Sequence, residues 1–415
     1  GMKVVNNADE AADQLASAKR EATAYFGRDE CYMERYLTKP RHVEVQILAD
    51  SHGNCVYLGT RDCSAQRRHQ KLIEEAPAAS IPDDIIAAMG DAAVAVAKGC
   101  DYVNAGTVEF LYEDGGFFYL EMNTRLQVEH PATELITGID LVEMQLRVAA
   151  GEALPFTQDE VQVRGHSIEI RINAEDPAGG AFLPSPGPIN TLKTPDGFAT
   201  RFDTGYETGD NISQFYDNLI GKLIVWGHDR PTAIARALRA LGELKIEGVA
   251  TTIPADIAIL EHPDFAALEH STKWVEDTLD LTGVGSSTTE AATDDEPRVK
   301  RDLDVEVNGK RFSVSMWVPE SATAATPSGP PKSRRSAGAA SGGSNSGDVT
   351  APMQGTIVKV NVSVGDQVES GDAIVVLEAM KMENSVGAEK SGTVTEVRVS
   401  EGDSVGGGDV IAVIE

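Results

Sequence analysis

The C-terminal part of the chain contains a tandem duplication. Residues 355–378 align without a gap on residues 392–415 after a shift of 37 positions. The positions that coincide are Gly355/Gly392, Gly365-Asp366/Gly402-Asp403, Gly371-Asp372/Gly408-Asp409, Val360/Val397, Val368/Val405 and Ile374/Ile411. Neither copy is large enough to bury an apolar face alone, and Gly-Asp pairs are typical of tight turns. The duplication therefore predicts a pseudo-twofold β-sandwich or flattened barrel.

Lys381 lies where the first copy passes into the second, in the run Glu378-Ala379-Met380-Lys381-Met382. A tight connection between the copies is expected to hold this side chain in solvent. Most exposed lysines are merely solvated, and that is the alternative. Two methionines around a lysine at the symmetric turn of a duplication favour a lysine that carries a covalent modification.

The composition limits the classes of partner. The chain has 65 acidic and 36 basic residues and a formal net charge of −29. Such a surface repels phosphate backbones, which argues against nucleic acid. An acidic excess spread along the chain suits a cytoplasm of high salt, and we predict a halophilic source. No apolar run has the length of a membrane span, and the 4 cysteines form no Cys-x-x-Cys pair or disulfide framework. A cytoplasmic protein without membrane partners or zinc is expected.

Local patterns divide the rest of the chain. Residues 8–25 are expected to be helical. The acidic, Thr-rich residues 283–296 indicate a loop, and alternation over residues 303–318 around Asn308-Gly309 predicts a hairpin for docking or spacing. Residues 321–348 are rich in Ser, Ala, Gly and Pro and predict a flexible linker.

Residues 107–123 predict a β-hairpin with two facing carboxylates. Pairing centred on Gly115 places Glu109 opposite Glu121 on one face and Phe110 opposite Leu120 on the other. Asn123 joins the carboxylate face. Because opposed like charges destabilise a hairpin, a compensating cation is expected, and hard oxygen ligands suit Mg²⁺ or Mn²⁺. The alternative is a turn centred elsewhere, with both glutamates solvated.

The segment that follows has Arg125, Gln127 and Glu129 at a spacing of two. If this segment is extended, the three side chains point the same way, beside the predicted metal site. An arginine and a glutamate aimed together indicate a planar anion held by the guanidinium, with the carboxylate as base. A surface ion pair is the alternative. Upstream, we interpret the basic run 61–71 as a positive patch for phosphate or another small anion, rather than a solvated face.

These segments together resemble the biotin carboxylase component of biotin-dependent carboxylases, an ATP-grasp enzyme. The resemblance covers nearly all of residues 1–280. The matching runs are residues 32–37, 40–44, 61–71, 74–77, 106–110, 121–131, 169–177 and 182–187. The duplicated segment resembles the biotinyl domain of the same enzymes, whose lysine is biotinylated within Ala-Met-Lys-Met. Lipoyl domains share that fold but usually flank their lysine with Asp and Ala, so a lipoylated carrier is the less favoured alternative.

The resemblance implies an α+β fold followed by a flattened all-β barrel of the biotinyl/lipoyl type. It also implies these domains: residues 1–150, the C-terminal part of an ATP-grasp domain; 151–282, the biotin carboxylase C-terminal domain; 283–320, a loop and small hairpin; 321–348, the linker; and 349–415, the biotinyl carrier domain.

The resemblance, carried over position by position, also implies roles for single residues. For the nucleotide and metal, Glu34, Arg35, Tyr36 and Leu37 would line the adenine pocket, His42, Gln66 and His69 would contact ribose or phosphates, and Glu109, Glu121 and Asn123 would hold Mg²⁺ or Mn²⁺ beside ATP. For the carboxyl group, Lys71, Arg125 and the Val128 backbone would grip bicarbonate, Glu129 would deprotonate it, Arg171 would stabilise the biotin enolate, and Lys381 would carry biotin.

The implied reaction begins with ATP and bicarbonate, passes through carboxyphosphate and carboxylates biotin on Lys381. Metal ions would screen phosphoryl charge, and fixed donors would stabilise charge that develops late. The domain arrangement looks like the α subunit of an acetyl- or propionyl-CoA carboxylase. A carboxyltransferase β subunit that acts on acyl-CoA and a biotin protein ligase are therefore the expected partners, in a hetero-oligomer. The other hypothesis is a biotinyl carrier or interaction subunit with an inactive, truncated ATP site.

The sequence departs from the family at two places. Gly1-Met2-Lys3 is not a translation start, whereas family members begin with a dinucleotide-fold-like domain and the first half of the ATP-grasp lid. We therefore expect a fragment that does not turn over alone. Asn104 stands where the family usually has glycine.

Overall fold

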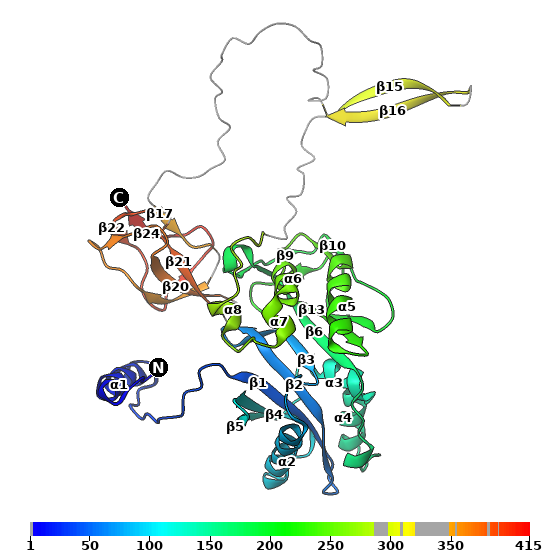
Figure 1. Cartoon of the computed structure of the whole chain (residues 1–415). Coiled ribbons are helices and arrows are strands. Elements are labelled where there is room, and N and C mark those ends of the chain that lie inside the picture. Colours follow the sequence, from blue (N-terminus) through cyan, green and yellow to red (C-terminus); the bar gives the residue numbers. More distant parts are fainter. Residues whose placement is uncertain are drawn as a thin grey trace.

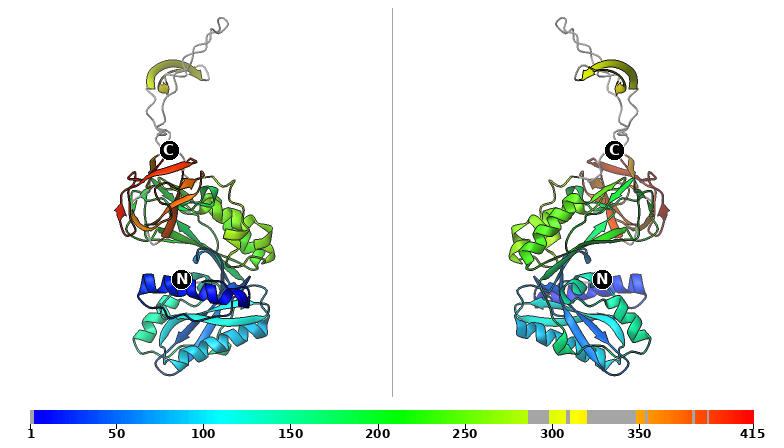
Figure 2. Two further views of the ribbon diagram at one scale, coloured as in Figure 1. Left: turned by 90° about the vertical axis from the view of Figure 1, so that its left-hand side faces the viewer. Right: turned by 90° about the vertical axis from the view of Figure 1, so that its right-hand side faces the viewer.

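The structure is a computed structural model (Figure 1) that describes residues 3–285, 298–307, 310–319, 348–352, 355–379, 382–388 and 390–415. Buried apolar side chains gather in several clusters between Val43 and Leu281 and in another between Val349 and Ile414. The chain thus has two units with their own cores, coloured blue to green and orange to red in Figure 2.

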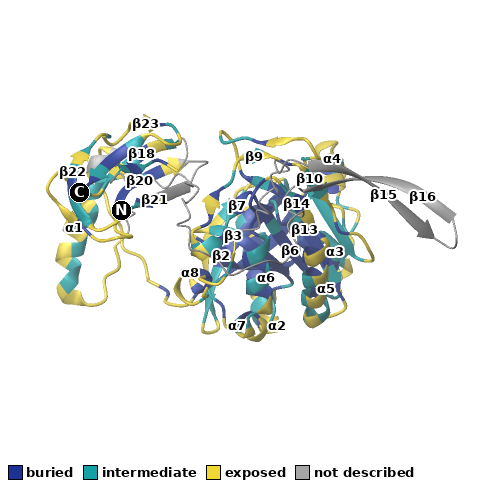
Figure 3. Cartoon of the chain, turned by 90° about the horizontal axis from the view of Figure 1, so that it is seen from above, coloured by how far each residue is buried: buried dark blue, intermediate teal, exposed yellow. Residues whose placement is uncertain are grey.

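The first unit is built on an eight-stranded sheet of order β11-β13-β6-β3-β2-β1-β4-β5, in which all neighbours are antiparallel. Its strands are β1 (Arg41–Ala49), β2 (Cys55–Arg67), β3 (Gln70–Ala76), β4 (Asn104–Glu113), β5 (Gly116–Asn123), β6 (His166–Asn173), β11 (Thr200–Thr204) and β13 (Leu219–Gly227). Figure 3 shows the central strands β2, β3, β6 and β13 as mostly buried.

The two faces of this sheet differ in chemistry. The helices that pack on it are α2 (Asp83–Gly99), α3 (His130–Thr137), α4 (Leu141–Ala149) and α5 (Arg230–Glu243). Odd-numbered residues of β1 from Val43 to Ile47 pack with buried residues of α2. In the other half of the sheet, β6 and β13 pack in the same way with α5. Even-numbered residues from His42 to Gln46 are buried but polar and point to the opposite face, because side chains alternate along a strand. That polar face, partly covered by α3 and α4, is where the candidate site lies.

Shorter elements complete this unit. The predicted N-terminal helix is confirmed as a 3₁₀ turn, Ala8–Glu10, followed by α1 (Ala11–Phe26). The remaining elements are 3₁₀ turns Gln158–Glu160 and Ala178–Gly180, helices α6 (Ile253–Glu261), α7 (Pro263–Ala267) and α8 (Trp274–Asp277), and the strand pairs β7 (Glu175–Asp176) with β8 (Leu183–Pro184), β9 (Gly187–Pro188) with β12 (Asn211–Ile212), and β10 (Thr191–Lys193) with β14 (Lys245–Glu247). Within the described ranges, no helix combines the length and the apolar character needed to cross a bilayer.

The hairpin predicted between the two units is present. Strand β15 (Arg298–Val307) pairs antiparallel with β16 (Lys310–Pro319), and Val307 lies opposite Lys310. The predicted turn residues Asn308 and Gly309 lie outside the described residues, as do the predicted linker up to residue 347 and most of the predicted loop 283–296.

The second unit has the predicted pseudo-twofold symmetry. It consists of two four-stranded sheets of order β17-β24-β22-β19 and β21-β20-β18-β23. The strands are β17 (Asp348–Thr350), β18 (Gly355–Val360), β19 (Gln367–Val368), β20 (Ala373–Ala379), β21 (Met382–Gly387), β22 (Gly392–Val397), β23 (Ser404–Val405) and β24 (Val410–Ile414). The 37-residue shift turns each strand of one sheet into its counterpart in the other, so the duplication in sequence is a duplication in structure.

The two copies are tied together by hydrogen bonds that repeat with the same shift. The Gly365 N–H donates to the Val394 carbonyl at 2.8 Å, and the Gly402 N–H donates to the Ile357 carbonyl at 2.7 Å. Each bond runs from a turn in one copy to a strand in the other. Strand β20 pairs with β21, and Ala379 lies opposite Met382. Lys381, between these strands in sequence, lies outside the described residues.

Candidate active site

The predicted carboxylate hairpin is confirmed at its central pair. Glu109 on β4 lies directly opposite Glu121 on β5. The Asn123 amide donates to both carboxylates, at 3.1 Å to Glu109 Oε1 and 3.2 Å to Glu121 Oε1. An amide therefore bridges two acidic groups that would otherwise only repel each other.

The expected pairing of Phe110 with Leu120 is wrong, because Phe110 lies opposite Tyr119. The turn consists of Asp114 and Gly115 with φ of 51° and 78°, a two-residue Asp-Gly connection. Near this turn, the two strands therefore pair one residue away from the pairing that was expected. An irregularity between Glu109 and Phe110 shifts the pairing back by one residue, so the two carboxylates still face each other.

Glu109 is the acidic centre of the site. Its Oε2 lies 3.0 Å from His42 Nε2, and its Oε1 accepts from Gln127 Nε2 at 2.8 Å and from Lys71 Nζ at 3.3 Å. Burial alone would raise the pKa of Glu109. The hydrogen bond from His42 and the charge of Lys71 outweigh burial and lower this pKa to about 2. Glu109 is therefore ionised at neutral pH.

Lys71 connects three carboxylates. Its Nζ lies 2.8 Å from Glu44 Oε2, 3.3 Å from Glu109 Oε1 and 2.6 Å from Glu129 Oε1. Burial works against its charge, but Cys63 and these carboxylates hold the pKa of Lys71 above its ordinary value. Lys71 is thus a fixed cation that points into the site.

Glu129 lies between two cations. Beside the contact with Lys71, its Oε2 accepts from Arg171 Nη2 at 2.9 Å, and Arg171 Nε donates to Glu74 Oε1 at 2.6 Å. The Glu129 side chain is 2% exposed, so it is almost completely shielded from solvent. Burial lowers the pKa of Arg171, but Glu74 and Glu129 raise it above its ordinary value overall.

The predicted row of Arg125, Gln127 and Glu129 is only partly formed. Gln127 and Glu129 are buried and face the site, as their spacing of two suggests. Arg125 is exposed and donates to Asn123 Oδ1 at 3.1 Å and to the Leu126 carbonyl at 3.4 Å. The segment is not a strand, because it turns toward helix α3 after Gln127.

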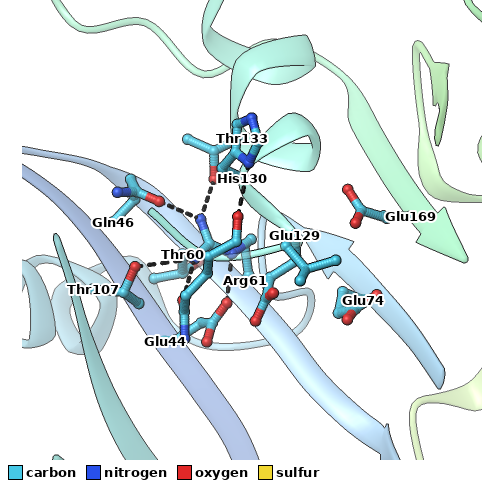
Figure 4. A network of polar contacts seen from close by, with 12 residues as sticks. Glu44, Gln46, Thr60, Arg61, Glu74, Thr107, Glu129, His130, Thr133 and Glu169 are labelled. Atoms are coloured by element: carbon cyan, nitrogen blue, oxygen red, sulfur yellow. Dashed lines mark hydrogen bonds and ion pairs between the residues drawn. The ribbon is translucent and has the colours of Figure 1, made fainter. Parts of the chain in front are cut away.

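Arg61 is not part of an anion-binding patch, contrary to our interpretation of the basic run. Its side chain is completely buried, and every one of its five N–H donors is used inside the protein (Figure 4). The acceptors are Glu44 Oε1, Gln46 Oε1, Thr133 Oγ1, Thr107 Oγ1 and Gln127 Oε1. Arg61 therefore orders the site but offers no donor to a ligand.

A second group of buried carboxyls lies beside Arg171. Glu74 and Glu169 face each other on β3 and β6, and Figure 4 shows both near Glu129. Both oxygens of Glu169 and Oε2 of Glu74 have no hydrogen-bond partner among the described residues. Lys222 Nζ lies 3.9 Å from Glu169 Oε1. Burial raises the pKa of Glu74 and, more strongly, that of Glu169.

The residues expected near adenine lie in the irregular segment before β1. Glu34, Arg35 and Tyr36 are exposed, and Leu37 is buried. The Arg35 guanidinium lies 5.2 Å from the centre of the Phe118 ring, on the tip of the carboxylate hairpin. Together with that hairpin, the segment forms the open rim of the site.

The residues expected near ribose and phosphates lie on β1 and on the β2–β3 hairpin. Gln66 is buried and donates to the Cys63 carbonyl at 3.0 Å, and its Nε2 lies 3.4 Å from His42 Nδ1. His69 is exposed at the hairpin tip, where Arg68 and His69 have φ of 46° and 63°. Two consecutive non-glycine residues with positive φ are uncommon and are often found at functional positions.

The sequence patterns give no role to six further residues of the site: Glu44, Gln46, Glu74, Thr133, Glu169 and Lys222. Polar residues 42, 44 and 46 alternate with apolar residues 43, 45 and 47, a signal that β1 has one polar face. This signal does not distinguish a polar face in water from a buried one. The others come from separate strands and a helix, so no local pattern unites them.

The acidic residues fit a divalent cation. Ionised Glu109 and its partner Glu121 supply hard oxygens, and ligand atoms of His42, Glu44 and Glu109 lie within 4.8 Å of one another. Asn123 presents its NH₂ group to the carboxylates and its oxygen to Arg125. Asn123 would therefore become a ligand only with its amide turned over.

Asn104 has a structural explanation. As the first residue of β4 it has φ of 94°, a conformation that favours glycine. Asn104 Oδ1 accepts from the Ala105 N–H at 2.8 Å, and its Nδ2 donates to the Gln145 carbonyl at 3.2 Å. These bonds offset the unfavourable backbone, so asparagine is tolerated where the family usually has glycine.

Comparisons with known proteins agree with this geometry. Three family profiles match: "Carbamoyl-phosphate synthase L chain, ATP binding domain" at residues 1–157, "Biotin carboxylase C-terminal domain" at 169–277 and "Biotin-requiring enzyme" at 347–414. A curated relative, the biotin-dependent acyl-coenzyme A carboxylase alpha3 subunit of Mycobacterium leprae, is 47% identical over 405 residues, which cover 94% of this chain and 67% of that protein. The chain belongs to the family of biotin-dependent acyl-CoA carboxylase α subunits.

Two biotin carboxylases extend the comparison to enzymes and to solved structures. The Haemophilus influenzae enzyme is 50% identical over 265 residues, which cover 64% of this chain and 59% of that enzyme. A crystal structure of the Campylobacter jejuni biotin carboxylase–β-γ-ATP complex has a TM-score of 0.61 and 43% identity, and the match covers 66% of this chain and 61% of that one. The chain therefore spans about three fifths of the length of these biotin carboxylases.

A second solved structure is described as containing bicarbonate. The biotin carboxylase domain of a thermophilic 2-oxoglutarate carboxylase, described as bound to bicarbonate, has a TM-score of 0.63 and 43% identity over 65% of this chain and 61% of that one. The predicted fold class is confirmed by these neighbours and profiles. The expected cofactors of the family, covalent biotin, ATP and Mg²⁺ or Mn²⁺, are confirmed as well.

Proposed function

We propose that the full-length protein carboxylates its own biotin, attached at Lys381, with ATP and bicarbonate. The observation that supports this most directly is the buried Glu129 carboxylate held between Lys71 at 2.6 Å and Arg171 at 2.9 Å. A base fixed between two cations, beside the acidic pair Glu109 and Glu121, suits proton removal from a small anion near a metal-bound phosphate.

Bicarbonate would bind between Lys71, Arg125 and the Val128 N–H. Lys71 offers a fixed charge, and Arg125 is exposed at the rim with its guanidinium near Asn123. Glu129 would accept the bicarbonate proton on a carboxylate oxygen, which raises the nucleophilicity of bicarbonate toward the γ-phosphorus of ATP. Arg171, which contacts Glu129, would stabilise the negative charge on the biotin ring during its carboxylation.

ATP would lie along the rim of the same face. We propose that the segment from Glu34 to Leu37 contacts adenine and that His42, Gln66 and His69 contact ribose or phosphates. Glu109, Glu121 and, with its amide turned over, Asn123 would hold the metal ion. When bound, Mg²⁺ or Mn²⁺ would screen the phosphoryl charge. Because Glu109 is ionised at neutral pH, it is ready to bind a cation without losing a proton.

The second half of the proposal concerns partners. Biotin on Lys381, attached by a biotin protein ligase, would carry the carboxyl group to a separate carboxyltransferase β subunit. That subunit would act on acyl-CoA, with acetyl-CoA and propionyl-CoA as the first candidates. The 28-residue linker 321–348 that we predict between the two units would raise the effective concentration of the carrier at both sites. The proposed assembly is a cytoplasmic hetero-oligomer, and the domain limits 1–150, 151–282, 283–320, 321–348 and 349–415 belong to the same proposal.

The central test measures ATP cleavage by the full-length protein with and without bicarbonate. Glu129→Gln should reduce the bicarbonate-dependent rate by at least about 100-fold, as expected for loss of a general base, while ATP still binds. Glu143→Gln, an exposed change on α4, is the control and should leave the rate unchanged. A native rate that does not respond to bicarbonate would favour the inactive carrier hypothesis.

A second test concerns the attachment site. Lys381→Arg should abolish labelling by streptavidin after incubation with biotin protein ligase and biotin. Lys390→Arg, an exposed lysine in the same unit, is the matched control and should be labelled like the native protein. An intact mass that matches lipoate rather than biotin would contradict the proposal.

A further inference from the structure

The loop between β5 and α3 has two consecutive backbone carbonyls that are held by side chains. His130 Nδ1 lies 2.7 Å from the Gln127 carbonyl oxygen, a contact drawn in Figure 4. Lys222 Nζ donates to the next carbonyl oxygen, that of Val128. The two side chains come from different elements, helix α3 and strand β13.

The contact from His130 fixes the direction of the Val128 N–H, and the contact from Lys222 fixes the next peptide of the loop. A trans peptide is planar, and its N–H points away from its C=O. Because His130 holds the Gln127 carbonyl, the Val128 N–H in the same peptide must point to the other side. This N–H has no hydrogen-bond partner in the part of the chain that the structure describes. Val128 thus offers a free donor of fixed direction between Gln127 and Glu129, which both face the site.

The His130 ring suits this task. A carbonyl oxygen can only accept, so Nδ1 must carry the hydrogen. Burial lowers the pKa of His130 to about 4, which keeps the ring neutral at physiological pH. His130 also begins helix α3, whose Ala132 and Ile136 are buried in the core. The ring is therefore mounted on a packed helix rather than on a mobile loop.

Lys222 completes the arrangement from the sheet. It lies directly opposite Arg171 in the β13–β6 pairing, and like charges in that position destabilise a sheet. Arg171 is neutralised by Glu74 and Glu129, whereas Lys222 reaches to the Val128 carbonyl and has Glu169 at 3.9 Å. The lysine side chain is 13% exposed, so it has been taken largely out of water to make this contact. Its position is explained by the carbonyl that it holds.

We propose that His130 and Lys222 are positioning residues that aim the Val128 N–H at bicarbonate. This inference rests on the proposed function, because it assigns the direction of a donor in the proposed bicarbonate site. Neither side chain touches the substrate. His130 acts through the Gln127 carbonyl, in the same peptide as the Val128 N–H, and Lys222 acts through the Val128 carbonyl, in the next peptide, so Val128 is held from both sides. Loss of either contact frees one side of Val128, and its N–H can then turn away from the anion.

The test is steady-state ATP cleavage by the full-length, biotinylated protein, with bicarbonate and ATP varied separately. His130→Ala should raise KM for bicarbonate about 10-fold, the effect of one misdirected hydrogen bond, with KM for ATP changed less than about twofold. His130→Asn places an amide donor near the position of Nδ1 and should restore KM for bicarbonate to within about threefold of the native value. A merely structural role for the ring would instead lower the amount of active protein and affect both substrates alike.

The controls separate the possible failures. His52 Nε2 lies 2.9 Å from the Gly151 carbonyl oxygen, away from the site, so His52→Ala removes a similar contact and should leave both KM values unchanged. If His130→Ala does not fold, Lys222→Gln must raise KM for bicarbonate selectively for the inference to stand. An unchanged KM for bicarbonate in His130→Ala, or failure of His130→Asn to recover it, overturns the inference alone. A native protein without bicarbonate-dependent cleavage overturns the proposed function and the inference with it.

Discussion

The two folded units bury different kinds of side chain. In the 348–415 unit, the buried residues that the structure describes are all apolar, among them Ile357, Ile374 and Ile411. In the sheet unit, the polar face buries ionisable groups that include Arg61 and Glu44, both with no exposed side-chain surface. The 348–415 unit, called the carrier unit below, is thus stabilised by apolar burial and turns. The site in the sheet unit is stable only as long as each buried charge keeps its partner.

This difference teaches where each unit is vulnerable. An apolar core loses stability in proportion to the volume removed, and its two symmetric halves should lose it equally. A buried charge network fails as a whole, because removal of one partner leaves another charge buried and unpaired. The following experiments use this contrast.

The largest effect is expected for Arg61→Met in the sheet unit. The change removes the 2.5 Å partner of buried Glu44, leaves Lys71 as its remaining cation and removes five hydrogen bonds, which together should cost about 3–5 kcal/mol of unfolding free energy. Chemical denaturation, with hydrogen exchange resolved to peptides, should show the loss in the sheet unit and none in residues 348–415. Arg147→Met, which breaks an exposed pair with Glu152, is the control and should cause no measurable loss. Equal losses for the two variants would contradict the contrast.

The symmetric pair Ile374→Ala and Ile411→Ala tests the carrier unit. Both side chains are completely buried at equivalent positions, so each change should cost about 3 kcal/mol. Hydrogen exchange of the amides in the 348–415 unit measures this loss. A difference of more than about 1 kcal/mol between the two variants would show that the copies are not energetically equivalent.

Asp256 in helix α6 tests the cost of a buried acid without a partner. Both of its oxygens have no hydrogen-bond partner within the described residues, and burial raises its pKa well above the ordinary value. A raised pKa in the folded state means that stability is full below the pKa of the unfolded chain and falls as pH rises through the folded-state pKa. Asp256→Asn removes this loss. The unfolding free energy of the variant should therefore exceed that of the native protein by an amount that grows from about pH 4 upward and reaches about 1–2 kcal/mol. Denaturation curves at several pH values measure it, and a gain that does not change with pH would contradict the assignment.

The smallest effect is expected at the repeated turns of the carrier unit. Asp366 Oδ2 accepts from the Ser363 N–H at 2.8 Å, and Asp403 Oδ2 accepts from the Ser400 N–H at 2.7 Å. Asp366→Ala and Asp403→Ala should each cost about 1 kcal/mol, the value of one such bond. Thermal unfolding of the carrier unit, followed by hydrogen exchange of the amides in that unit, should show the same loss of unfolding free energy for both variants. Unequal losses would indicate that only one turn supports the fold.

The sequence predicted the carrier unit well, because its rules are local and repeated. The 37-residue shift identified equivalent strands, and the Gly-Asp pairs identified turns such as Gly365-Asp366, whose glycine has φ of 101°. The facing of Glu109 and Glu121 was also predictable, because side chains alternate along paired strands. The error at Phe110 arose from a register change inside the strand pair, which has no mark in the sequence.

The rest of the site could not be predicted for a physical reason. Arg61 lies in a basic run, and such a run has the same composition whether it faces water or a buried network. The five acceptors around Arg61 lie between 15 and 72 positions away along the chain, so only the folded sheet brings them together. The same holds for Lys222, which reaches the loop of Val128 from 94 positions away.

The hydrogen bonds between the two copies in the carrier unit also constrain the order of events during synthesis. Turns of each copy bond to strands of the other, and β24 pairs with β17 and β22, so one of the two sheets is incomplete until Val410–Ile414 has left the ribosome. Lys381 is translated before that strand. A ligase that recognises the folded unit must therefore wait until Val410–Ile414 has been translated, so Lys381 becomes a substrate only some time after its own synthesis.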